Sequence, residues 1–274
     1  MRNDSATLQQ FLGSAAVKNR LEKILESSPE SFISSILTIY RNNSKLQDCS
    51  PNSILNAAVM AAILKLPITP SLGFAYIVPY KGQATFQIGW KGLVQLAMRS
   101  NLYRTINAGK IYEGQIKEID FITGEIIRGE KISDEVVGYI AYIELLNGFQ
   151  KSLYMSVGEL EEHAKKYSQS YSYDLHSGKN SSVWSKNFDA MAKKTVLKLL
   201  LSRFGIFSID QRSLDLTVAL RADQAVVTEN GFRYIDNEHG EEKIVPFDDI
   251  LDGEKIIASP ESDGEKDEQE ENND

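Results

Sequence analysis

The stretch Val136-Val-Gly-Tyr-Ile-Ala-Tyr-Ile-Glu-Leu145, followed after four residues by Gln150-Lys-Ser-Leu-Tyr-Met155, decides the fold class. Both segments are rich in β-branched and aromatic residues, which favour strands. Asn147-Gly148 lies between them, and this dipeptide is the strongest short-range signal for a hairpin. The sequence therefore predicts an antiparallel hairpin over these residues.

Further strand-like segments precede this hairpin, and Lys81-Gly82-Gln83 is the expected turn between the first two. They are Phe74–Tyr80, Ala84–Ile88, Tyr103–Tyr112, Lys117–Phe121 and Ile126–Arg128.

Helices are expected on both sides of the strands. Ser50 is a good N-cap and Pro51 suits the first helical position, so a helix begins there and runs to about Leu66. This helix is apolar nearly all round, which is typical of a buried helix. Further helices are expected within the first 48 residues and over Val157–Lys166, Trp184–Phe204 and Gln211–Val226, with a polar loop at 168–182.

Together these elements predict an α+β fold. A small antiparallel sheet with its hairpins packs with a long basic helix, helices precede it at the N-terminus, and a disordered acidic tail follows it. The longest apolar stretch, Ile54–Leu66, is broken by Asn56 and Lys65 and is too short for a membrane span. One cysteine excludes a disulfide within the chain, and no secretory signal is visible at the N-terminus. We therefore expect a cytoplasmic protein.

Charge divides the chain into a mildly basic body and a strongly acidic C-terminal part. Residues 1–220 carry 25 Lys and Arg against 20 Asp and Glu, whereas residues 221–274 carry 5 against 18. A basic body is compatible with an anionic partner despite the overall net charge of −8. We predict an N-terminal helical region at 1–48, a core at 49–220 and a largely disordered tail at 221–274.

The 64 residues between Asp48 and Glu113 contain no Asp or Glu. Cations without interspersed carboxylates are what binding to a phosphate backbone requires, because each nearby carboxylate weakens the attraction. The alternative is that this stretch is largely buried, where acidic residues are rare. Its cations are Lys65, Lys81, Lys91, Arg99, Arg104 and Lys110.

The segment Trp184–Phe204 predicts a long helix with two faces. One face carries Phe188, Met191, Ala192, Thr195 and Leu199, and the opposite arc carries Lys186, Lys193, Lys194 and Lys198. Four ammonium groups on one exposed face can follow successive phosphates, and Trp184 can stack on an unpaired base. Alternatively, the lysines form an ordinary solvated face and Trp184 lies in the core.

Signals for enzymatic chemistry are weak. Gly89-Trp90-Lys91-Gly92 has two interpretations: its backbone amides and Lys91 bind a phosphate, or it is a plain tight turn. It is not a Walker A loop, because the Gly-Lys-Ser/Thr of that motif is missing. A divalent-metal nuclease that uses acidic residues from the middle of the chain remains an alternative. Those residues are Glu113, Glu118, Asp120, Glu125 and Glu130.

Several groups of residues occur in an order and spacing that resemble one family. They are Leu66-Pro-Ile-Thr-Pro70, Ala75-Tyr-Ile-Val-Pro-Tyr80, Phe86-Gln-Ile-Gly-Trp-Lys-Gly-Leu93 with Leu96-Ala-Met-Arg-Ser100, and Trp184-Ser-Lys-Asn-Phe188 with Met191-Ala-Lys-Lys-Thr195. Over residues 25–210 the chain resembles the RecT family of phage and prophage single-strand annealing proteins. It departs from the family at Trp90, where Tyr is frequent, and at Lys198, where Arg is common.

The resemblance implies an ATP-independent recombinase rather than an enzyme. Such a protein coats single-stranded DNA as a homo-oligomer, in rings or helical filaments, and pairs complementary strands into an annealed duplex. The resemblance also implies a 5′→3′ exonuclease partner and, in some members, contact with the host single-strand-binding protein. No cofactor and no membrane association are implied. A passive single-strand-binding protein that does not anneal DNA remains a second alternative.

From the charge pattern and the resemblance together, we predict DNA contacts by cationic and aromatic residues. They are Lys81, Trp90, Lys91, Arg99, Arg104, Lys110, Tyr112, Trp184, Lys186, Lys193, Lys194, Lys198 and Arg203. Substitution of Lys194 and Lys198 is expected to weaken DNA binding and to leave folding unchanged, because surface charges contribute little to stability. The apolar face of the N-terminal helices, with Phe32, Ile36 and Tyr40, is expected to contact the next subunit or to pack within the chain.

Overall fold

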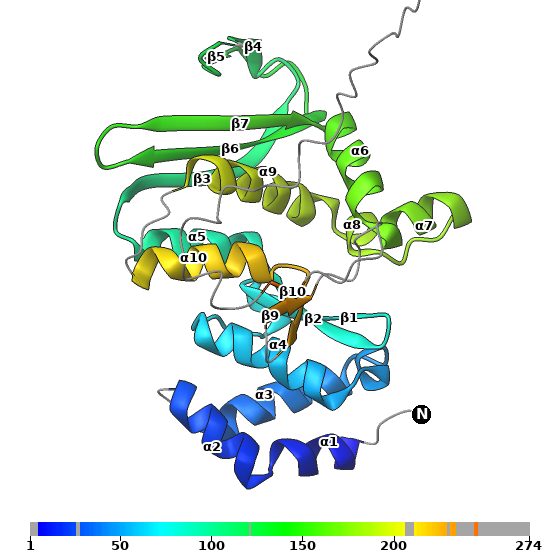
Figure 1. Cartoon of the computed structure of the whole chain (residues 1–274). Helices are drawn as coiled ribbons and strands as arrows, with labels where there is room; N and C mark the ends of the chain where they lie inside the picture. Colours follow the sequence, from blue (N-terminus) through cyan, green and yellow to red (C-terminus); the bar gives the residue numbers. More distant parts are fainter. Residues whose placement is uncertain are drawn as a thin grey trace, which may run out of the picture.

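The computed structural model describes residues 5–25, 28–120, 122–205, 211–228, 231–233 and 244–245. Figure 1 shows the N-terminal helices at one end of the molecule, a three-stranded sheet towards the other end and further helices between them. The combination of helices with small antiparallel sheets confirms the predicted α+β class. None of the described helices is both long enough and apolar enough to cross a membrane.

The N-terminal helices pack on one another and on α4 (Pro51–Ile63). They are α1 (Ser5–Leu12), α2 (Ala15–Ile24) and α3 (Pro29–Arg41), and a 3-10 turn, η1 (Leu46–Asp48), precedes α4. Helix α4 begins as predicted, because the Ser50 hydroxyl oxygen accepts a hydrogen bond from the Ser53 N–H. Ile36 and Tyr40 are buried in the chain's own core, and Phe32 packs against that core. Of the two expectations for this face, the structure thus shows packing within the chain rather than a face left free for the next subunit.

The first predicted hairpin consists of β1 (Ala75–Tyr80) and β2 (Gln83–Ile88), and it packs on α4. A 3-10 turn, η2 (Pro70–Leu72), precedes it, and α5 (Trp90–Arg99) follows it. Lys81 and Gly82 have φ of 46° and 75°, the left-handed values of a two-residue type I′ turn. A Cβ on Gly92 would lie 2.3 Å from the Phe74 carbonyl oxygen, so only glycine allows α5 to approach this segment so closely.

The main sheet has the strand order β3 (Tyr103–Tyr112), β6 (Val136–Leu145), β7 (Gln150–Ser156), and both pairs are antiparallel. The predicted hairpin therefore forms its centre and one edge. Side chains of β6 alternate, with Tyr139, Ala141 and Ile143 buried. The sheet packs against α9 (Phe188–Phe204), which lies along it in Figure 1.

A separate hairpin is inserted between β3 and β6. It consists of β4 (Ile116–Ile119) and β5 (Ile126–Arg128), and Figure 1 shows it beyond the main sheet, on the side away from α9. This placement leaves the hairpin outside the main core.

The helices that follow the sheet are α6 (Val157–Tyr167), α7 (Gln169–Ser177) and α8 (Val183–Lys186). The prediction of a loop over 168–182 is wrong, because α7 occupies much of it. Its polar residues bond to one another: the buried Asp174 carboxylate accepts hydrogen bonds from Ser181, Ser182 and Ser185. The predicted helix from Trp184 to Phe204 is also interrupted, because Asn187 leaves the helical conformation between α8 and α9.

The C-terminal part of the described chain packs against the core. Helix α10 (Gln211–Ala222) packs on α5, and β8 (Val226–Thr228), β9 (Gly231–Arg233) and β10 (Ile244–Val245) form a small antiparallel sheet. Strand β8 packs on α4 and β2, and Ala225 and Val226 are buried. The predicted start of the disordered tail at residue 221 is therefore wrong. The acidic segment after Val245 lies outside the described residues.

Candidate nucleic-acid interface

Helix α9 is covered on two sides, by the main sheet and by α5. Its buried residues consequently occur around most of its circumference rather than on one face. They are Ala192, Lys194, Thr195, Val196, Leu197, Leu200 and Leu201. The prediction of one apolar face opposite one lysine face is therefore wrong, because a helix between two layers has no fully solvated side.

Asp189, in the first turn of α9, lies between two lysines. Its carboxylate is 3.1 Å from Nζ of Lys110 on β3 and 2.9 Å from Nζ of Lys193, one turn further along α9. Lys193 Nζ also lies 5.9 Å from the centre of the Trp90 ring, at the start of α5, within the range of a cation–π contact. We call Trp90, Lys110, Asp189 and Lys193 the Asp189 cluster.

The Asp189 cluster is accessible and carries an excess of positive charge. The Lys110 side chain is 36% exposed and the Lys193 side chain 20%, so an anion can approach both ammonium groups. Burial raises the pKa of Asp189, but the hydrogen bonds from Lys193 and Lys110 outweigh burial and lower it. Burial and the nearby Asp189 charge raise the pKa of Tyr139 to about 12. With Tyr139 neutral, two cations face one carboxylate.

Four aromatic rings contact one another in succession: Tyr171, Trp184, Phe188 and Tyr139. The ring centres of Trp184 and Phe188 are 5.5 Å apart in an edge-to-face arrangement, and those of Tyr139 and Phe188 are 6.0 Å apart. Trp184 is only 6% exposed. The structure therefore places Trp184 in the core, which was the alternative to a base-stacking platform.

A second carboxylate, Asp223, binds the other two lysines of α9. Its oxygens lie 2.8 Å from Nζ of Lys194 and 2.8 Å from Nζ of Lys198, and one of them also accepts a hydrogen bond from the Ile88 N–H at 3.1 Å. We call Lys194, Lys198 and Asp223 the Asp223 cluster. The Asp223 side chain is fully buried and that of Lys194 is 7% exposed.

Burial raises the pKa of Asp223, but the charges of Lys194 and Lys198 outweigh burial and lower it. The prediction that Lys194 lies on an exposed face is thus wrong. The expectation that its removal leaves folding unchanged no longer holds either, because breaking a buried ion pair is costly.

Arg99 and Arg104 have partners within the chain. The Arg99 guanidinium donates hydrogen bonds to the carbonyl oxygens of Leu64 and Lys65 at 2.6 and 3.0 Å, where α4 ends. It also lies 3.7 Å from Asp215 of α10. Cations favour helix C-termini, so Arg99 ties α5 to α4 and α10. Arg104 forms an ion pair with Glu144 at 3.1 Å and is largely exposed.

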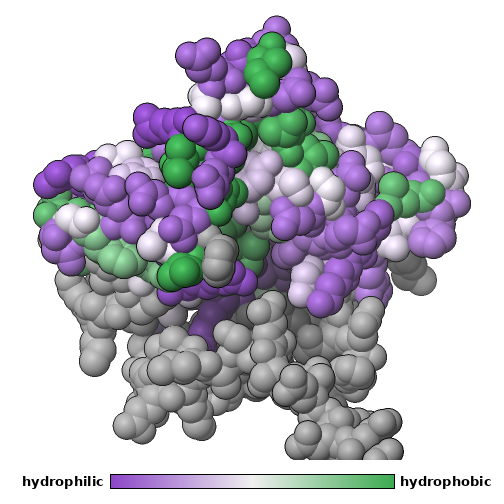
Figure 2. Space-filling view, turned by 90° about the horizontal axis from the view of Figure 1, so that it is seen from above, coloured by the Kyte–Doolittle hydropathy of each residue, from purple (hydrophilic) through white to green (hydrophobic). Residues whose placement is uncertain are grey.

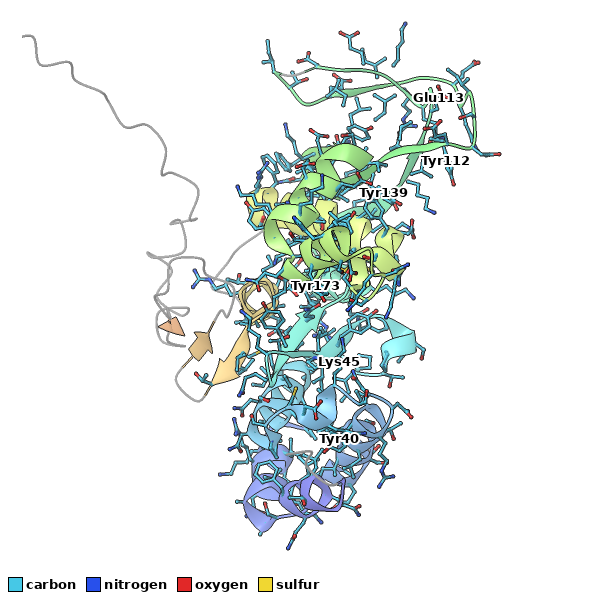
Figure 3. All side chains as sticks on the ribbon, turned by 90° about the vertical axis from the view of Figure 1, so that its right-hand side faces the viewer. Tyr40, Lys45, Tyr112, Glu113, Tyr139 and Tyr173 are labelled. Atoms are coloured by element: carbon cyan, nitrogen blue, oxygen red, sulfur yellow. The ribbon has the colours of Figure 1, made fainter. Side chains whose placement is uncertain are left out.

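The remaining predicted residues are distributed over several surfaces. Lys91 follows Trp90 on α5, and Lys186 ends α8 three residues before Asp189; both are exposed. Tyr112 stacks under Nζ of Lys131 at 4.1 Å, and Figure 3 shows it close to Tyr139 at the sheet end of the molecule. By contrast, Lys81 lies at the β1–β2 turn. Arg203 lies in the last turn of α9, about 21 Å along the helix from Asp189.

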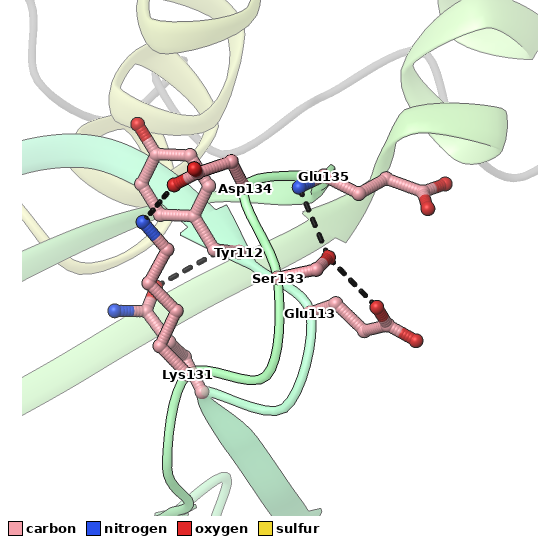
Figure 4. Close-up of polar contacts among 7 residues, drawn as sticks. Tyr112, Glu113, Lys131, Ser133, Asp134 and Glu135 are labelled. Atoms are coloured by element: carbon pink, nitrogen blue, oxygen red, sulfur yellow. Dashed lines mark hydrogen bonds and ion pairs between the residues drawn. The ribbon is translucent and has the colours of Figure 1, made fainter.

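Within the described residues, no three His, Cys, Asp or Glu side chains come together to hold a metal ion. Two of the acidic residues considered for a nuclease site shape the β4–β5 hairpin instead. Glu113 accepts a hydrogen bond from the Ser133 hydroxyl, as Figure 4 shows. Asp120 accepts hydrogen bonds from the N–H groups of Ile122 and Thr123.

The residues that sequence reasoning missed are the carboxylates that organise the lysines. Asp189 and Lys193 are four residues apart on one helix, a spacing that favours an ion pair. This spacing could have identified Asp189 as the partner of Lys193. Asp223 is 25 and 29 residues from its lysines. No local signal connects residues so far apart.

Partly exposed lysines beside a tryptophan are typical of a protein that binds a nucleic-acid backbone. Comparison with known proteins agrees: the chain matches the RecT family over residues 30–246, and it belongs to this family. Membership supports a role in single-strand annealing during recombination.

Two relatives illustrate the range of the similarity. An uncharacterized protein of Bacillus subtilis (strain 168), YqaK, is 42% identical over 214 residues, which cover 77% of this chain and 72% of YqaK. Protein RecT of Escherichia coli (strain K12) is 26% identical over 219 residues, which cover 75% of this chain and 78% of RecT.

Proposed function

We propose that this chain is an ATP-independent protein that coats single-stranded DNA as a homo-oligomer and anneals complementary strands. The observation that carries the proposal is the Asp189 cluster, where Lys110 and Lys193 place two ammonium groups against one carboxylate beside Trp90. Exposed Lys91 and Lys186 adjoin this cluster along the chain. A DNA phosphate finds there a net positive site with an aromatic ring at its edge.

Annealing forms no covalent bond, so the protein needs no catalytic residue. The lysines neutralise part of one backbone, which lowers its repulsion of a second strand. Base pairing between the two strands then supplies the sequence specificity. A row of subunits extends the site along the strand, and a 5′→3′ exonuclease and the host single-strand-binding protein are the partners we propose for supplying that strand.

The decisive experiment mixes complementary oligonucleotides, one with a fluorophore and one with a quencher, with the purified protein and no nucleotide. The proposal expects pairing much faster than the spontaneous reaction, with no gain from ATP. Binding of either strand without faster pairing would identify a passive single-strand-binding protein. Shortening of end-labelled DNA in Mg²⁺ or Mn²⁺ would identify a nuclease.

A further inference from the structure

Asp189 is the only acidic residue in the two segments of sequence that build the Asp189 cluster. These segments, residues 49–112 and 175–209, carry six Lys and Arg each and one acidic residue in total. The structure places this single carboxylate where the ammonium groups of Lys110 and Lys193 converge. A carboxylate at that point opposes the attraction of both lysines for a phosphate, so its presence in a DNA site requires an explanation.

The stability of the fold does not supply that explanation. The Asp189 side chain is 39% exposed, and those of Lys110 and Lys193 are 36% and 20% exposed. Ion pairs at such exposed positions contribute little to the free energy of folding. The Asp223 carboxylate, by contrast, is fully buried. Of the two carboxylates that bind lysines of α9, Asp189 is therefore the one that an approaching DNA strand meets.

The two contacts of the Asp189 carboxylate are unequal. Oδ2 accepts a hydrogen bond from Lys193 Nζ at 2.9 Å. Oδ1 is buried and lies 3.1 Å from Lys110 Nζ, but it has no well-aligned hydrogen-bond donor among the described residues. Hydrogen bonds weaken steeply as their alignment is lost. Lys110 therefore loses little when it exchanges this carboxylate for another anion.

A phosphate bound to these lysines lies close to the carboxylate. A phosphate oxygen about 2.8 Å from the Lys193 ammonium is at most about 6 Å from Asp189 Oδ2, because that oxygen is 2.9 Å from the same nitrogen. Two like charges about 6 Å apart repel one another by the equivalent of about 3- to 100-fold in affinity, for an effective dielectric constant between about 80 and 20. The carboxylate thus competes with phosphate for the same two lysines.

We propose that Asp189 is a positioning residue that holds the ammonium groups of Lys110 and Lys193 together in the free protein and weakens their hold on single-stranded DNA. A bound phosphate replaces the carboxylate at Lys110, where the hydrogen bond is poorly aligned. The carboxylate pairs with Lys110 again when the strand leaves, and it thereby speeds strand release. This inference rests on the proposed function, because it assigns a role to one residue of the proposed DNA site.

The test removes the charge of the carboxylate and keeps its size. The variant is Asp189→Asn in the full chain, and a labelled short oligo-dT strand reports its affinity and its rate of release into excess unlabelled strand. We expect about tenfold tighter binding than wild type and slower release. The slope of log K against log salt should increase in magnitude by ~0.7, because one more ammonium charge becomes available to a phosphate.

A matched control removes the same charge from the other side of the main sheet. Glu144 pairs with Arg104 at 3.1 Å, and it alternates with buried residues of β6, so it lies on the face away from α9. Figure 2 looks down on that side, where hydrophilic and hydrophobic residues are interspersed. Glu144 is five residues along β6 from Tyr139, the register partner of Lys110, which is about 17 Å.

This separation exceeds the distance over which exposed charges interact at physiological salt, about 8 Å. Glu144→Gln should therefore bind oligo-dT within about twofold of wild type. A second control tests whether the gain depends on the lysines. In the variant Lys110→Ala with Lys193→Ala, adding Asp189→Asn should change the affinity less than about twofold, because neither ammonium group remains for the carboxylate to neutralise.

Circular dichroism melting establishes that each variant is folded at the temperature of the assay. If Asp189→Asn unfolds the chain, Asp189→Ser replaces it, because serine is favoured where a helix begins. The serine variant also lacks the charge, so the same tighter binding and slower release are expected.

Three results would overturn the inference. They are a folded Asp189 variant that binds no tighter than wild type, equal tightening by Glu144→Gln, and equal tightening without the two lysines. The proposed function fails in a different way. If removal of Lys110 and Lys193 leaves binding unchanged, the proposed DNA site is wrong. If that removal weakens binding while Asp189→Asn does not strengthen it, only the role of Asp189 is wrong.

Discussion

The Asp223 carboxylate lies 2.8 Å from the Lys194 ammonium, and the two side chains are 0% and 7% exposed. This ion pair joins the end of α10 to the middle of α9, and a hydrogen bond from the Ile88 N–H joins β2 to the same carboxylate. Three elements thus meet at one buried charge. Lys194 therefore stabilises the fold through this buried ion pair, whereas the sequence predicted it to be an exposed DNA contact.

Asp223→Asn should strongly destabilise the fold. It keeps the size of the side chain but leaves the buried Lys194 charge without its counter-ion, which costs about 3–5 kcal/mol. Urea unfolding followed by circular dichroism measures the decrease in stability. Lys193→Ala is the control, because its partly exposed pair with Asp189 should contribute about 1 kcal/mol or less. Equal decreases for the two variants would contradict the structural role of Asp223.

The contribution of Asp223 should depend on pH in a defined direction. Its pKa is lowered in the folded state, so its contribution is fully present above the unfolded value of about 3.9 and is lost as pH falls towards the native value. The difference in unfolding free energy between wild type and Asp223→Asn should thus be largest near neutral pH and shrink below about pH 4. A difference that stayed constant between pH 7 and pH 3 would show that the carboxylate charge is not involved.

Trp184→Ala should lower stability rather than remove a base-stacking platform. The ring is buried against Phe188 and Tyr171, and truncating a buried aromatic residue costs about 3–5 kcal/mol. Thermal melting and single-strand affinity, measured on the same preparation at a temperature where the variant is folded, separate the two roles. A stable variant with affinity weaker by about 1–3 kcal/mol would instead support base stacking.

Lys110→Ala with Lys193→Ala should weaken single-strand binding and flatten its salt dependence. The slope of log K against log salt is negative, and if each lysine neutralises one phosphate, its magnitude decreases by ~0.7 for each lysine removed. Affinity for an oligonucleotide across a salt series measures this slope. Lys117→Ala, an exposed lysine in the acidic hairpin region, is the control and should leave the slope unchanged. An unchanged slope in the double variant would exclude the Asp189 cluster as a DNA-binding site.

Removal of the chain after Val245 should leave single-strand binding intact or tighter. That segment is rich in Asp and Glu, which repel a phosphate backbone. The deletion keeps β10, so the small C-terminal sheet retains its third strand. Oligonucleotide affinity of the truncated and full chains, compared at equal salt, is the measurement. Weaker binding by a folded truncated chain would show that the segment belongs to the DNA site.

Much of the local structure followed from the sequence. The predicted strands Tyr103–Tyr112, Ile126–Arg128 and Val136–Leu145 have the observed bounds, because alternation and turn residues act over a few residues. The polar stretch 168–182 misled the same reasoning. Its serines and Asp174 bond to one another within the folded chain, so polarity there reflects a hydrogen-bonded helix end rather than a loop.

The sequence by itself determined the α+β class, the two hairpins, the family and the positive character of the body. These depend on local periodicity, turn chemistry and composition, which neighbouring residues along the chain carry. Only the tertiary structure decided which lysines are accessible. Helix α9 lies between the main sheet and α5, and Asp223 reaches Lys194 and Lys198 from another helix. A helical wheel assumes one buried side, whereas packing between two layers buries most of the circumference and makes distant carboxylates the partners of its cations.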